Sequence, residues 1–70
     1  MARIIIQASR RIELSDGFVT ALNVLKESGF KPRPGTKLVS KYAVIVVEDE
    51  NSASAVERLR AGDLPAEVEV

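Results

Sequence analysis

Three adjacent carboxylates form the densest group of reactive side chains in this sequence. Glu48-Asp49-Glu50 follows an apolar run directly and precedes a helical pattern. Carboxylate oxygens are the ligands that hard cations such as Mg²⁺ and Ca²⁺ prefer. The same tripeptide is also typical of a solvated turn, whose negative charge favours the start of the next helix. We adopt the turn interpretation and predict no metal site.

A set of basic side chains is the second candidate for binding chemistry. The basic set comprises Arg10, Arg11, Lys31, Arg33, Lys37 and Lys41. Gathered on one surface, these side chains would contact the phosphates of a nucleic acid. Sheets that bind RNA usually add aromatic residues on which bases stack, and Tyr42 alone is expected outside the core. We predict a solvated face, with an RNA- or ribosome-associated protein as the alternative.

Two residue types central to catalysis are missing. The sequence contains no histidine and no cysteine. Their absence excludes nucleophile–base pairs built on either residue and the commonest zinc ligands. There is also no glycine-rich phosphate-binding motif. We therefore predict a protein that is not an enzyme, with no catalytic residue and no cofactor.

The size and charge of the chain limit its organisation. Seventy residues predict a single domain over residues 1–70. The net charge is zero, but residues 1–41 hold eight basic and three acidic side chains, and residues 42–70 hold two and seven. The first apolar run, Ile4-Ile5-Ile6, is too short for a signal peptide or membrane span. We expect a cytoplasmic protein without membrane contact.

The chain is organised around Tyr42-Ala43-Val44-Ile45-Val46-Val47, which is apolar at both alternate sets of positions and predicts a central strand. The expected elements are a strand over 2–14, a helix from 15–17 to Gly29, an edge strand or loop over 30–36, a strand over 37–47, a helix from 51–52 to Gly62 and a strand over 66–70. Pro34-Gly35 predicts a turn.

This order of elements predicts an α+β fold. Two right-handed crossovers give a ferredoxin-like two-layer sandwich, βαββαβ, with an antiparallel sheet of order 4-1-3-2 and both helices on one face. Pro32 cannot donate a ladder hydrogen bond, so its segment suits an edge. The alternative is a three-stranded sheet with residues 30–36 as a loop.

Apolar residues on both sides of the central strands predict a docking surface. The predicted apolar set is Ile5, Val39, Ala43, Ile45 and Val47, opposite a face bearing Leu38, Val44 and Val46. Two helices cover only one face, so a second apolar face needs a partner. We predict a small interaction module that docks this face or a sheet edge onto a protein, including a second copy as a homodimer.

The chain also resembles ACT domains, which are small regulatory modules. The resemblance is carried by Asp16-Gly17-Phe18-Val19, Leu25 and Gly29, followed by Tyr42–Val47 and a second helix. It implies the same strand order and a side-by-side dimer. It further implies a sensor that binds an amino acid or a similar small molecule near Asp16 and Gly17.

The carboxyl half is similar to a small large-subunit ribosomal protein of eukaryotes and archaea. This similarity lies in Ser40-Lys41-Tyr42, Val46-Val47, Asp49, Ala53, Leu59 and Leu64. It implies contact with ribosomal RNA through Lys31, Lys37 and Lys41.

Overall fold

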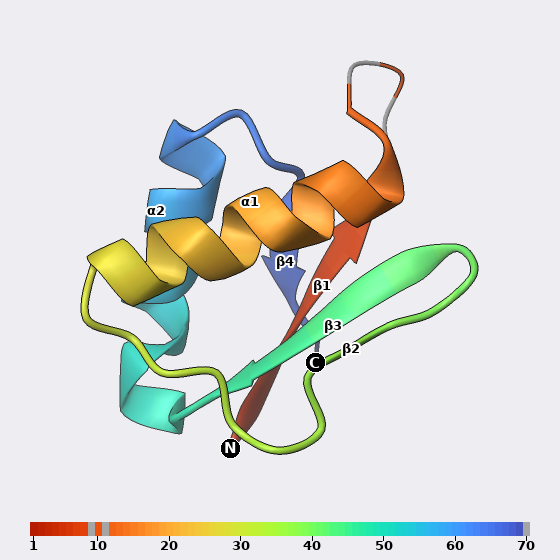
Figure 1. Ribbon diagram of the computed structural model, residues 1–70. Helices are drawn as coiled ribbons and strands as arrows, with labels where there is room; N and C mark the ends of the chain where they lie inside the picture. The colour runs from red at the N-terminus through yellow and green to blue at the C-terminus, as the bar shows by residue number, and fades with distance from the viewer. Residues whose placement is uncertain (9, 11, 70) are drawn as a thin grey trace.

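The computed structural model describes the whole chain except residues 9, 11 and 70. Its elements are β1 (Ala2–Gln7), α1 (Leu14–Glu27), β2 (Lys37–Leu38), β3 (Tyr42–Val47), the 3₁₀ helix η1 (Asp49–Asn51), α2 (Ser52–Ala61) and β4 (Ala66–Val68). The four strands of the described residues form one antiparallel sheet in the order β2-β3-β1-β4 (Figure 1). Read from the β4 edge, this order is 4-1-3-2. The chain is a small α+β protein.

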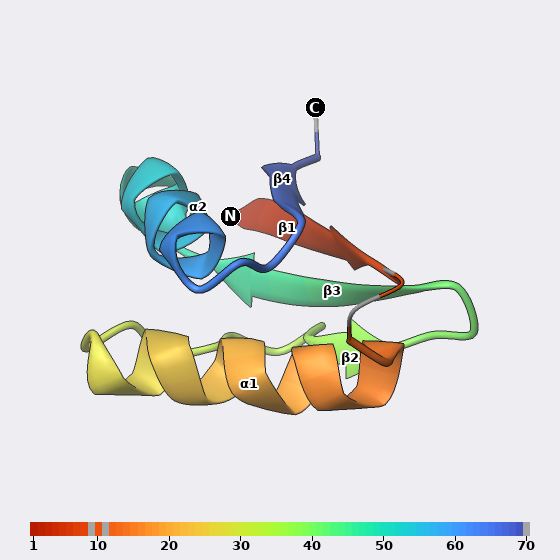
Figure 2. The ribbon, with the colours of Figure 1, turned by 90° about the horizontal axis from the view of Figure 1, so that it is seen from above.

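The two described α-helices lie on the same side of the sheet, because residues of both belong to one core cluster with β1 and β3. Figure 2 shows α1 beside β2 and β3, and α2 nearer to β1 and β4. The register pairs Ile4 with Ile45 across β1 and β3, so both side chains point to the same face. Both are fully buried, together with Leu25 of α1 and Leu59 of α2. The hydrophobic core therefore fills the space between this face and the two helices. Neither described helix has the length or apolar character needed to cross a bilayer.

The expected strand over 37–47 is a hairpin of two strands. The backbone leaves the sheet after Leu38, and the Val39 amide donates to the Tyr42 carbonyl at 2.9 Å. The polar pair Ser40-Lys41 interrupts the apolar pattern, so the chain turns there. The expected strand over 2–14 likewise ends early, at Gln7.

The segment over 30–36 is a loop along the end of β3, and the second strand is Lys37–Leu38. The Arg33 amide donates to the Val46 carbonyl at 2.8 Å, and the Val46 amide donates to Thr36 Oγ1 at 3.0 Å. Prolines at 32 and 34 have no amide hydrogen, so a regular ladder cannot form. The expected Pro34-Gly35 turn is present, with Gly35 at φ +105°.

Both helices end where the sequence predicts and α2 begins there as well, whereas α1 begins slightly before its predicted start. Gly29 has φ +88°, as expected of the residue that ends α1. Helix α1 begins at Leu14, just before the expected cap, and Glu13 makes no side-chain capping bond. At the start of α2, Ser52 Oγ donates to the Asp49 carbonyl at 2.8 Å, and Gly62 follows the last turn.

Candidate functional site

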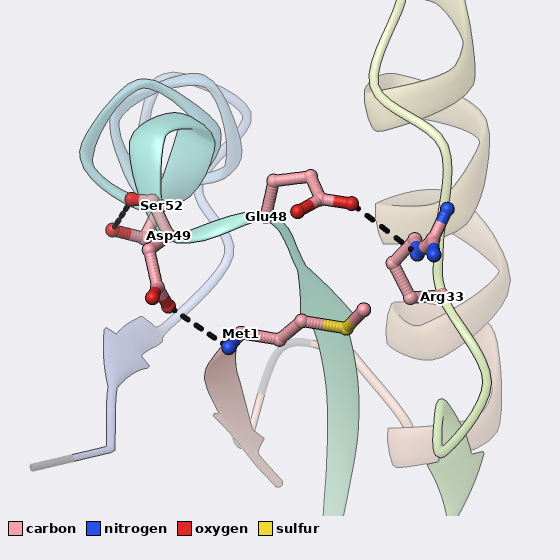
Figure 3. A network of polar contacts seen from close by, with 5 residues as sticks. All are labelled: Met1, Arg33, Glu48, Asp49 and Ser52. Atoms are coloured by element: carbon pink, nitrogen blue, oxygen red, sulfur yellow. Dashed lines mark hydrogen bonds and ion pairs between the residues drawn. The ribbon is translucent and has the colours of Figure 1, made fainter.

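The carboxylates at the end of β3 face separate cations and not one another (Figure 3). The Asp49 carboxylate lies 3.3 Å from the amino group of Met1, and the Glu48 carboxylate lies 3.4 Å from Arg33 Nε. Within the described residues, no three acidic, histidine or cysteine groups gather as a metal site requires. The arrangement instead joins the starts of β1 and η1 and fixes the 30–36 loop to β3.

This geometry predicts that divalent cations do not stabilise the fold. The thermal unfolding midpoint is expected to be the same in millimolar Mg²⁺ or Ca²⁺ as in sodium chloride of matched ionic strength. Binding to the native state alone would raise the midpoint by mass action. A cation-specific increase that disappears in Glu48→Gln and Asp49→Asn would contradict the prediction. Differential scanning fluorimetry provides the measurement.

The basic set extends along the sheet from end to end. Arg10 follows the end of β1 at which Gln7 pairs with Tyr42, and Lys41 precedes that same pair. The Arg33 amide donates a hydrogen bond to the Val46 carbonyl near the opposite end of β3, and the Arg33 guanidinium forms an ion pair with Glu48. Lys37 pairs with Val44 between them.

Every described member of the basic set, including Lys31, is exposed, and Arg11 lies outside the described residues. The structure therefore does not bring the described basic side chains together as one compact patch.

The predicted apolar set is wrong as a single face. Ala43, Ile45 and Val47 are buried in the core beneath the helices. Ile5 pairs with Val44, so it lies on the opposite face. Val39 lies beyond β2 and is half-buried. Side chains alternate with period two, so grouping Ile5 with Ile45 shifted β1 by one residue and exchanged its two faces.

The face away from the helices carries one residue of each strand in a row. Glu67 pairs with Ile5, Ile5 with Val44, and Val44 with Lys37. Val44 is 1% exposed and Ile5 is half-buried, while the two charged residues at the ends are exposed. We call this side of the sheet the open face and these four residues its central row. The open face thus has an apolar middle and charged edges of opposite sign.

A shallow depression of about 390 Å³ lies on the open face. It is lined by Arg3, Ile5, Gln7, Lys41, Tyr42 and Glu69. Arg3 Nη1 lies 3.0 Å from Glu69 Oε2, and the Glu69 amide donates to the Arg3 carbonyl at 2.7 Å. Tyr42 is 39% exposed at the opposite side of the depression. Ile5, the Tyr42 ring and the Arg3–Glu69 ion pair give this surface both apolar and charged groups.

The sequence contains one signal for this surface. Within β1, Ile5 is an apolar residue on the side otherwise occupied by Arg3 and Gln7. An isolated apolar residue among polar ones on a strand face marks the middle of an exposed surface. Val44 and Tyr42 could not be added to it without the register of β1 and β3.

The positions that the ACT resemblance singled out are in the first turns of α1. Gly17 is buried, and a Cβ atom there would lie 3.5 Å from Ile12 Cγ2 and 3.9 Å from Leu64 Cδ2. Asp16 is exposed beside it. This glycine is therefore packed against neighbouring apolar side chains.

The open face is the described surface with the most features of a binding site. It combines the depression, a half-buried isoleucine, an exposed tyrosine and charges of both signs. No family model, curated protein or solved structure matches this chain.

Proposed function

We propose that this chain is a small interaction module that docks a protein partner on the open face and catalyses no reaction. One observation carries the proposal: within the described residues both helices pack on one side of the sheet, and the other side, which no described helix covers, presents the half-buried Ile5 and the exposed Tyr42. A sheet face that bears apolar side chains and lacks a second layer is a common site of association.

The chemistry of the open face favours a protein over a nucleic acid. Protein interfaces have an apolar centre enriched in tyrosine and arginine with a polar rim. Tyr42, Ile5 and Arg3 line the depression in this way. Nucleic acid requires a surface dominated by positive charge. Here Glu67 and Glu69 lie on the same face as Lys37 and Lys41.

Two further observations support a role without catalysis. The sequence has no histidine and no cysteine to act as nucleophile or general base. The Glu48 and Asp49 carboxylates, which could hold a cation, are each paired with a protein cation. We further propose that the architecture is ferredoxin-like. The split β-α-β connectivity and the sheet order support this assignment.

Exchange of Ile5 for glutamate tests the proposal. Ile5→Glu is expected to abolish capture of a protein partner, because it places a charge in the apolar middle of the interface. Immobilised wild-type and variant chains are compared in pull-downs from source cells, with a self-association measurement in parallel. Val19→Glu is the control, since Val19 is 57% exposed on α1 and lies outside the open face.

Retention of a partner by the wild type and by Val19→Glu, but not by Ile5→Glu, is the expected outcome. Circular dichroism confirms that both variants are folded. The proposal fails if the wild type neither self-associates nor retains a protein in a manner that depends on Ile5. Capture of RNA alone, lost on charge reversal at Arg33 and Lys37, would also contradict it.

A further inference from the structure

We propose that the occupant of the open face is a second copy of this chain, related by a two-fold axis that runs along the strands. This inference rests on the proposed function and adds the identity and the orientation of the partner. It is carried by the distribution of charge across the central row.

On the open face, the acidic side chains lie near one edge of the sheet and the lysines lie near the other. Glu67 and Glu69 belong to the β4 side, and Lys37 and Lys41 belong to the β2 side. Glu69 is already paired with Arg3. In the described part of the chain, Glu67, Lys37 and Lys41 make no ion pair. Each edge thus presents a charge that a partner of opposite sign could neutralise.

Symmetry decides which orientation uses these charges. Two copies packed face to face share an isologous interface, and their two-fold axis lies in the plane between them. If the axis runs along the strands between β1 and β3, Glu67 of one copy lies over Lys37 of the other, and Ile5 lies over Val44. If the axis runs across the strands, Glu67 lies over Glu67 and the like charges repel. The charge pattern therefore selects the first orientation.

The natural twist of the sheets leaves these contacts intact. Packed sheets keep their strands within about 30° of each other. The axis crosses the central row between β1 and β3, so rotation about that crossing displaces Ile5 and Val44 least. Glu67 and Lys37, about 7 Å from the crossing, move by about 4 Å, which their flexible side chains can span.

The size of the molecule limits the area of the dimer interface. The molecule measures 30 × 21 × 19 Å, so no flat face exceeds the product of the two longer dimensions. That limit is about 600 Å² per copy, at the low end for specific interfaces. We expect a reversible dimer in the micromolar range and not a permanent one.

Charge reversal tests both the partner and the orientation. In the proposed orientation, Glu67→Lys places a lysine over Lys37 of the other copy, and Lys37→Glu places a glutamate over Glu67 of the other copy. Each variant alone is expected to dissociate at least about tenfold more readily than the wild type. An equimolar mixture is expected to form a heterodimer, and the double variant, with its edges exchanged, to form a homodimer again. Both residues are exposed, so the fold is retained, which circular dichroism checks.

Sedimentation equilibrium from micromolar to millimolar concentration gives the association constants. The measurement is made at low ionic strength because dissolved salt weakens the interaction between exposed charges. At about 0.1 M salt, charges more than about 10 Å apart are largely screened from each other. A monomeric wild type, or single variants that dimerise as well as the wild type, would overturn the inference. Failure of the mixture to associate would also overturn it.

Ile5→Glu separates failure of this inference from failure of the proposed function. A dimer that both charge variants keep and Ile5→Glu loses would retain the docking face and reject the orientation. A monomeric wild type that captures another protein through Ile5 would retain the face and reject the second copy. A wild type that neither dimerises nor captures a protein in an Ile5-dependent manner would reject both.

Discussion

Replacement of Ile45 by alanine is expected to lower the free energy of unfolding by about 3 to 4 kcal/mol. Ile45 is 0% exposed, and its side chain lies in the core between the sheet and the helices. The truncation removes buried apolar surface and leaves a cavity that the surrounding side chains fill only in part. A core of this size rarely supplies more than about 3 to 5 kcal/mol, so the variant is expected to be largely unfolded. Urea denaturation followed by circular dichroism measures the change.

The matched control is Ile5→Ala, the same truncation on the adjacent strand. Ile5 is half-buried on the open face, so its loss is expected to cost about 1 kcal/mol in the isolated chain. The comparison tests the face assignment directly, because the two residues were expected to share a surface. Equal costs for the two variants would contradict the register of β1 and β3.

Replacement of Gly35 by alanine is expected to destabilise the fold by about 2 kcal/mol. Gly35 has φ +105°, a conformation that side-chain-bearing residues rarely adopt. A Cβ atom there would also lie 3.2 Å from Val46 Cγ2, closer than ordinary packing allows. The loop would have to shift, and the shift would disturb the bond from the Val46 amide to Thr36. Thermal and urea unfolding of the purified variant measure the loss.

Gly17→Ala is the control for this prediction, and the opposite sign is expected. Gly17 lies inside α1, and a Cβ atom there would meet Ile12 and Leu64 at ordinary van der Waals distances. Alanine is favoured over glycine in a helix by about 1 kcal/mol, so the variant is expected to be more stable by about that amount. Destabilisation by Gly17→Ala would contradict the helical backbone and the ordinary contacts assigned to Gly17.

Much of the local structure could be predicted from the sequence because its causes are local. Gly29 ends α1 and Gly35 supports a turn because both positions require a left-handed backbone. The apolar run Tyr42–Val47 is a central strand, since it is buried on both faces. The sheet order followed from the sequence of elements and the handedness of crossovers.

The strand limits were less accurate because alternation continues beyond a ladder. The pattern of residues 2–14 has the strand period, yet β1 ends at Gln7. The hairpin at residues 39–41 was read as continuous strand, since Ser40-Lys41 contains no glycine or asparagine to indicate a turn. Where a strand ends depends on the neighbour with which it pairs, and that neighbour is distant in the sequence.

The sequence by itself determined which segments form the strands at the centre of the sheet, and it excluded chemistry that depends on histidine or cysteine. Only the tertiary structure decided which side of each strand faces the helices. That choice depends on the register between β1 and β3, and a change of one residue exchanges the two faces of a strand. Ile4 and Ile5 are equally apolar, so their side chains alone do not select the buried one. Packing against Leu25 and Leu59 selects Ile4 and leaves Ile5 on the open face.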